Sequence, residues 1–180
     1  LLHGPVHDIR VDRLRLEREA SHDPLELRGH VRLDGEALTL TARLGPEAEG
    51  ILPLAADIAG DGLRLTLEGS WPRHSGTPGW ALAAEAELNA AAAMRLATRF
   101  GHDLPLAGPL NAKARLAPGS PWPSVSDLTV RLGPTDAARL LPGLRLSRAE
   151  LRAASFDDPA QVSAQGTRNG ADLGLTASLP

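Results

Sequence analysis

Apolar and polar residues alternate along most of this 180-residue chain. In residues 25–45 a leucine, valine or alanine stands at nearly every second position, and mainly arginine, glutamate, histidine and threonine stand between them. Because a strand points successive side chains to opposite faces, this pattern predicts strands with one apolar and one polar face. The clearest predicted strands are 25–33, 38–44, 52–58, 63–67, 80–88, 110–116, 128–132, 144–151 and 173–179.

Residues typical of turns separate these segments. Asp34-Gly35 and Asn169-Gly170 are good signals for the two-residue type I′ turn that joins antiparallel strands. Further breaks fall at residues 60–62 and at Gly133-Pro134, where glycine, aspartate and proline favour turns. The sequence therefore predicts a mainly β fold, built as a long antiparallel meander.

One stretch departs from the alternation. Residues 89–100 open with Asn89, a good helix N-cap, continue with alanine and other helix formers, and precede Gly101. One short helix is expected at about 89–100. Its apolar face is expected to press onto the apolar side of the sheet. The residues of that face are Ala93, Leu96, Ala97 and Phe100.

The chain also resembles itself. Residues 10–44 align without a gap on residues 145–179, an offset of 135, and Gly35 and Leu40 meet identical residues there. A fixed register of this kind is the signature of a structural repeat. We therefore expect a fragment of a larger repeat protein, with one full unit at about 10–144 and the start of the next at about 145–180.

Composition narrows the classes of function. Hydrophobic residues make up 42% of the chain, the formal net charge is -3, and both signs of charge are interspersed, so no basic face indicates nucleic acid. Cysteine is absent, which excludes disulfides and thiolate chemistry. No apolar run reaches the roughly 18 residues that a membrane-spanning helix needs.

Candidate chemistry is sparse. His3 and His7 are four residues apart, but Gly4-Pro5 prevents the helix that would bring both onto one face around a metal. Neither a G-x-S-x-G elbow nor an S-x-x-K motif is present. We therefore expect a protein that is not an enzyme and has no catalytic residue, cofactor or metal site.

The apolar face itself remains to be explained. It either packs against a second layer as a dry core, or stays open and shelters the apolar part of a ligand. The side chains are mostly aliphatic, which suits acyl chains and a protein core equally well. Periodicity alone does not choose between the two.

Four phrases, taken in order, resemble the AsmA family of bacterial envelope proteins. They are the strand and hairpin of residues 23–45, the L-x-L-x-G ending of residues 52–71, the strand, helix and L-P-x-x-G-P run of residues 79–116, and the tryptophan, D-L and R-L-G stretch of residues 120–136. The resemblance covers nearly the whole chain, and its specificity lies in the order of the phrases.

Residues 133–143 depart from the family pattern, in which another glycine-punctuated strand is expected. The segment at about 135–141 is compatible with a second helical turn, with Thr135 or Asp136 as its cap.

The resemblance implies an open, curved β-groove in a periplasmic protein, anchored in the inner membrane by a helix outside this fragment. Such a groove would shelter phospholipid acyl chains between the inner and outer membranes and support outer-membrane biogenesis. The implied partner is a phospholipid or another acyl-chain lipid, with no nucleic acid; protein partners are not indicated. The lipid-facing candidates are Leu25, Leu27, Val31, Leu33, Leu38, Leu40, Leu44, Leu63, Leu65, Leu67, Leu128, Val130 and Leu132.

A second hypothesis stays open beside this one. The chain would then be a non-catalytic, β-rich structural or interaction module, such as an assembly factor or an adhesin repeat, with a dry core.

Overall fold

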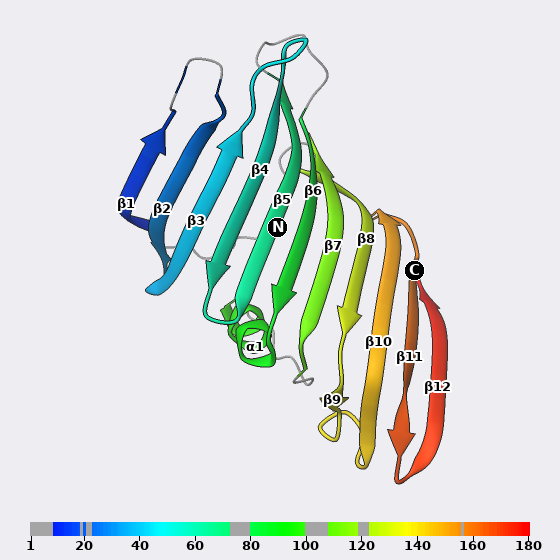
Figure 1. Ribbon diagram of the computed structural model, residues 1–180. Coiled ribbons are helices and arrows are strands. Elements are labelled where there is room, and N and C mark those ends of the chain that lie inside the picture. Colours follow the sequence, from blue (N-terminus) through cyan, green and yellow to red (C-terminus); the bar gives the residue numbers. More distant parts are fainter. Residues whose placement is uncertain are drawn as a thin grey trace. The chain divides into compact units, whose positions relative to one another are not determined.

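The computed structural model describes residues 9–18, 20, 23–72, 80–99, 108–118, 123–155 and 157–180, and the statements below concern this part of the chain. It consists of strands and one helix, α1 (Ala90–Arg99) (Figure 1). The strands are β1 (Ile9–Glu17), β2 (Leu25–Leu33), β3 (Glu36–Leu44), β4 (Ile51–Gly60), β5 (Leu63–Pro72), β6 (Ala81–Leu88), β7 (Leu110–Ala117), β8 (Ser124–Leu132), β9 (Thr135–Asp136), β10 (Leu144–Ser155), β11 (Ala160–Arg168) and β12 (Ala171–Leu179).

The sheet is an open antiparallel meander. Its hydrogen-bonding order is β1-β2-β3-β4-β5-β6-β7-β8-β10-β11-β12, and the short β9 pairs with β10. In the part of the chain described, β1 and β12 end this order and do not pair with each other, so the sheet is not closed. The predicted mainly β, antiparallel meander is therefore confirmed.

The described residues fall into two compact units, treated separately below. The first comprises Leu1–Glu85 and Arg115–Ser124, and the second Ala86–Ala114 and Val125–Pro180. In the first unit, β1 to β5 pair in consecutive antiparallel registers. In the second, β8, β10, β11 and β12 do the same.

The repeat seen in the sequence is present in the strand pairing. Every pair recorded between β1 and β2, and between β2 and β3, recurs at an offset of 135 in β10, β11 and β12. The pair Leu25–Leu44, for example, corresponds to Ala160–Leu179. The two three-stranded segments therefore share one register, and the turns that join their strands agree as well.

Those turns have the predicted geometry. Asp34 and Gly35 have φ angles of 50° and 86°, and Asn169 and Gly170 have 50° and 84°. A type I′ turn requires positive φ at both central residues, which aspartate and asparagine tolerate and glycine adopts freely. Both hairpin predictions are confirmed.

Each repeat also carries a β-bulge at the same place. The β1–β2 register shifts between Val11 and Arg13, and the β10–β11 register shifts between Leu146 and Arg148. The extra residue is Asp12 in one copy, and its carboxylate accepts a 2.8 Å hydrogen bond from Arg32 Nε. This bond raises the pKa of Arg32 above its ordinary value.

The bulge shifts the alternation of apolar and polar residues along β1 by one position. Apolar residues stand at Val11 and then at Leu14, which are an odd number of positions apart and would face opposite ways in a regular strand. With one extra residue between them, Val11 lies opposite Val31 and Leu14 opposite Gly29, so both belong to the same face. The interrupted alternation explains why β1 was not among the predicted strands.

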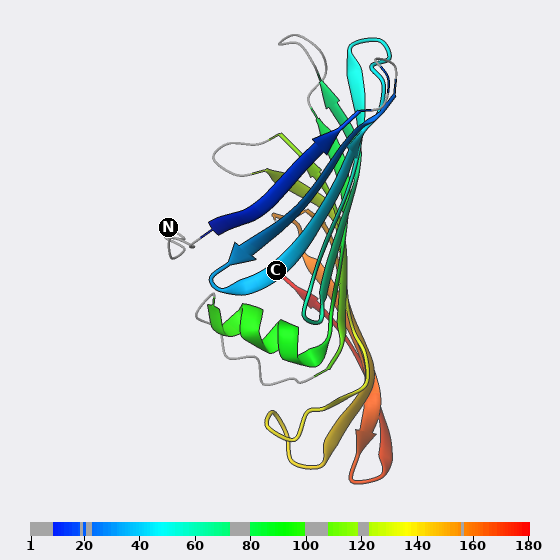
Figure 2. The same ribbon diagram turned by 60° about the vertical axis from the view of Figure 1, so that its left-hand side comes forward.

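Helix α1 agrees with its prediction in position and cap. Asn89 Oδ1 accepts a 2.8 Å hydrogen bond from the backbone N–H of Ala92. The buried face differs from the expected one, because Ala92 and Ala93 are buried whereas Leu96 is exposed. Phe100, expected on that face, and Gly101, expected just after the helix, lie outside the described residues. The helix follows β6 along the chain, as Figure 2 shows.

The second helical turn expected at about 135–141 is present in part, because it begins at Ala137 and not at Thr135. Thr135–Asp136 instead forms β9 and pairs with Leu146 and Arg145 of β10. A single turn follows, closed by a 3.1 Å hydrogen bond from Leu141 N–H to the Ala137 carbonyl. The turn stops there because Pro142 has no N–H to donate and Gly143 has a φ of 75°. Asp136 does act as the expected cap: its carboxylate accepts a 2.8 Å hydrogen bond from the Ala138 N–H.

Candidate functional site: the apolar face of the sheet

In the first unit, cross-strand pairs place the lipid-facing candidates on one face. Leu40 pairs with Ile58, and Ile58 pairs with Leu65, so the three side chains point to the same side of β3, β4 and β5. Leu27 joins the same face through its pair with Ala42 of β3. The same reasoning places there all the candidates of this unit, namely Leu25, Leu27, Val31, Leu33, Leu38, Leu40, Leu44, Leu63, Leu65 and Leu67.

In the second unit, the remaining candidates also share a face. Leu132 and Val130 of β8 lie opposite Ala149 and Leu151 of β10, and Leu128 lies opposite another alanine, Ala153. The apolar row continues across β11 and β12 through small and aliphatic residues. Each unit therefore presents a sheet with one aliphatic face.

The opposite face of the first unit is polar and carries paired charges. Arg28 lies 3.0 Å from Glu26, and Arg64 Nε donates a 2.8 Å hydrogen bond to Asp57. Surface pairs of this kind contribute little to stability, because both groups stay in contact with water. The polar face therefore suits contact with water, whereas the aliphatic face does not.

The apolar face is only partly buried. Of the lipid-facing candidates only Leu38 is buried, with 8% of its surface exposed, and the others are half-buried. In the described part of the chain no large side chain is fully buried. Few of its apolar residues are buried at all; beside Leu38 they are Leu88, Ala92, Ala93 and Ala137.

Sequence reasoning missed part of this face. Val11, Leu14 and Leu16 of β1 lie opposite positions of β2 that belong to it, and 57–61% of the surface of each is exposed. The signal was the odd spacing between Val11 and Leu14, which a bulge explains and a regular strand does not.

An aromatic pair stands at the end of the same row. The rings of Trp71 and Trp80 are stacked, with centroids 5.9 Å apart and planes 8° from parallel. Trp71 lies opposite Leu52 of β4 and is exposed. The aliphatic face of the first unit therefore ends in an exposed aromatic surface.

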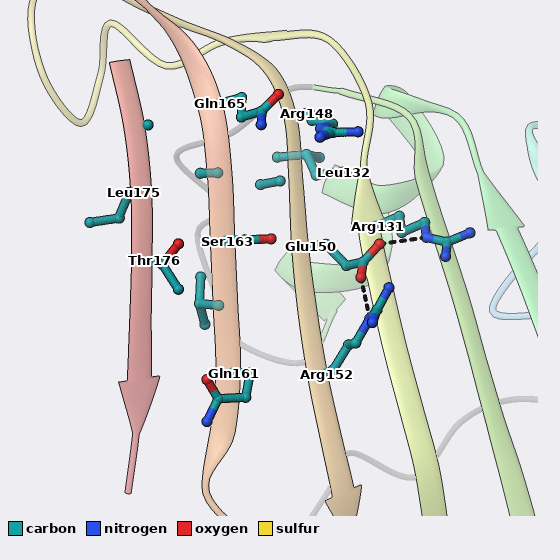
Figure 3. Close-up of a pocket in the computed structure, with 14 residues that line it drawn as sticks. Arg131, Leu132, Arg148, Glu150, Arg152, Gln161, Ser163, Gln165, Leu175 and Thr176 are labelled. Carbon is teal, nitrogen blue, oxygen red and sulfur yellow. Dashed lines mark hydrogen bonds and ion pairs between the residues drawn. The ribbon is translucent and has the colours of Figure 1, made fainter.

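The polar face of the second unit carries a depression of about 840 Å³ (Figure 3). Arg131 Nε donates a 2.8 Å hydrogen bond to Glu150, which also forms an ion pair with Arg152. The hydrogen bond from Arg131 is the main cause that holds the pKa of Glu150 below its ordinary value, and Arg152 lowers it further. Two guanidiniums beside one carboxylate favour its ionised form. A carboxylate with a lowered pKa binds a proton weakly, so Glu150 is poorly suited to act as a proton acceptor at neutral pH.

Two further observations concern chemistry and membranes. Among the described residues, no three histidines, aspartates or glutamates lie close enough together to hold a metal ion. Within the same residues, no helix is long and apolar enough to cross a membrane.

Comparisons with protein-family models, with curated proteins and with solved structures find no match to this chain.

Proposed function

We propose that this chain is a segment of a lipid-conducting β-groove, in which the apolar face of the sheet shelters phospholipid acyl chains. The observation that carries the proposal is the uncovered aliphatic face of β1 to β5. Apart from Leu38, which is buried, its large aliphatic side chains are half-buried or exposed, and they line up across five successive strands. An apolar surface that extends this far is typical of a site for an apolar partner.

The energetics favour an acyl chain as that partner. Covering a leucine side chain completely is worth roughly 1.5–3 kcal/mol relative to leaving it in water. The face offers mainly leucine, valine, isoleucine and alanine, which make no directional contacts, and an acyl chain needs none. The polar face, with its paired arginines and carboxylates, suits water on the other side of the sheet.

The resemblance to the AsmA family supplies the cellular setting of the proposal. On this basis the groove would lie in the periplasm, belong to a protein anchored in the inner membrane, and serve outer-membrane biogenesis by passing phospholipid between the two membranes. The chain would work without catalysis, as a surface along which lipid moves.

A charge on the apolar face tests the proposal. Leu40→Asp and Leu65→Asp each place a carboxylate on the face, where it can still reach water because the face is open. We expect native mass spectrometry to detect phospholipid on the wild-type protein purified from cells and none on either variant, while both variants keep near-native circular dichroism. The matched control is Thr39→Asp, which puts the same carboxylate at the neighbouring position of β3 on the polar face and should leave the bound lipid unchanged.

Two outcomes would contradict the proposal. If the wild-type protein carries no lipid, the face is not a lipid path in this chain. If Leu40→Asp and Leu65→Asp unfold while Thr39→Asp does not, the face is a dry core, as in the structural or interaction module that the sequence also allowed.

A further inference from the structure

The two strands that end the pairing order have differently built edges. Strand β1, with the sequence IRVDRLRLE, carries five charged residues and a bulge. Strand β12, with the sequence ADLGLTASL, has Asp172 as its only charged residue and pairs with β11 without a register shift. Charges and bulges are the usual means of preventing a sheet edge from pairing with another strand. Strand β1 has this protection, and β12 lacks it.

In the first copy of the repeat, the strand equivalent to β12 is β3, and its outer edge has a partner strand. Strand β12 occupies the place of β3 at the offset of 135, with the same register to its inner neighbour. The outer edge of β3 is paired with β4: Leu40 lies opposite Ile58, and Leu44 lies opposite Leu54. The same kind of edge is therefore occupied in one copy of the repeat.

Equivalent leucines of β3 and β12 differ in the fraction of their surface that is exposed. Leu38 of β3 is 8% exposed, whereas its equivalent Leu173 of β12 is 38% exposed. Leu175 and Leu179 are 53% and 48% exposed, although their equivalents on β3 are half-buried. The cover on β3 comes in part from β4, since a Cβ on Gly60 would lie 2.5 Å from Leu38 Cδ2.

We propose that the outer edge of β12 is a docking site for a strand of the β4 type, which pairs antiparallel in the register that β3 and β4 use. The occupant carries a glycine opposite Leu173 and aliphatic residues opposite Leu175 and Leu179, with polar or small residues on its other face. It covers three exposed leucines and satisfies a row of backbone groups at the edge. This inference is independent of what the apolar face carries.

The offset of the repeat defines a direct test. Pro180 corresponds to Gly45, so appending the sequence of residues 46–72 after Pro180 presents a second β4–β5 hairpin to β12 in the native register. We expect amide hydrogen exchange at Gly174 and Thr176 to slow about tenfold or more, because these amides, like those of Thr39 and Thr41 on β3, point to the outer edge of the strand and gain a neighbouring strand. The matched control carries Leu54→Asp and Ile58→Asp in the appended hairpin alone, and should leave exchange in β12 as it is in the unextended chain.

A second arm uses the unextended chain and a synthetic hairpin of residues 46–72 added in trans. Saturable slowing of exchange in β12, with no change in β1, supports the proposal even if the fusion folds poorly. The proposal is overturned if neither the fusion nor the hairpin protects β12. It is also overturned if sedimentation shows the unextended chain to be a dimer that Leu175→Arg makes monomeric, because the occupant is then a second copy of β12.

Discussion

Gly69 of β5 lies directly against the backbone of Ala81 at the start of β6. A Cβ on Gly69 would collide with the Ala81 carbonyl oxygen and would come within 2.9 Å of Leu82 Cα. These are backbone atoms, which cannot rotate away as the end of a side chain can. The close approach of the two strands therefore depends on the absence of a side chain at this position.

We expect Gly69→Ala to lower the free energy of unfolding by about 3 kcal/mol, at the upper end of the usual cost of overpacking, because the two strands must separate to admit the methyl group. Chemical denaturation followed by circular dichroism measures the change. Gly174→Ala is the matched control, since a Cβ there meets nothing within 4 Å. Equal stability of the two variants would show that β5 and β6 do not approach each other as described.

The titration of Glu150 should reveal its two arginine partners. Its pKa is lowered from 4.5 in the folded chain, so the stabilisation it provides is fully present above that pH and is lost as the pH falls through the lower folded value. NMR titration of the Glu150 carboxyl should give a midpoint below 4.5. Arg131→Gln should raise that midpoint more than Arg152→Gln, because the hydrogen bond from Arg131 is the largest cause of the shift.

A Glu150 midpoint that does not respond to Arg131→Gln would mean that the 2.8 Å hydrogen bond does not persist in solution.

The N-cap of α1 should be a separable contribution to stability. Asn89→Ala removes the acceptor of the Ala92 N–H and is expected to cost about 1 kcal/mol, the usual value for loss of an N-cap side chain. Asn89→Asp keeps an acceptor at the same place and should retain most of the stability. Thermal unfolding distinguishes the two, and identical losses in both variants would contradict the capping role.

Much of the fold could be predicted from the sequence because its causes are local. Strand β2 has the bounds that the alternation predicts, and the hairpins at Gly35 and Gly170 follow from residues that tolerate positive φ. The side of the sheet on which Leu40 and Leu65 lie also follows, since the period of a strand assigns its faces once the pairing is antiparallel. The repeat was visible because its register and turns are encoded by residues at fixed spacing.

Other features were decided only by tertiary structure. The bulge at Asp12 depends on β2, because only a paired neighbour shows which residue of β1 is the extra one. Thr135 forms a strand rather than a helical turn because β10 lies beside it and supplies a partner. Local propensity does not include such partners, and a short segment adopts whichever conformation its neighbours complete.

For the residues of the apolar face, too, the sequence determined one property and the tertiary structure another. Leu38 and Leu173 follow the same type of turn, occupy equivalent positions in one register and have the same side chain, yet one is 8% and the other 38% exposed. The alternating sequence determined that both point to the apolar face. Whether that face is covered was decided by the strand alongside, because burial is a property of the surroundings of a residue and not of the residue itself.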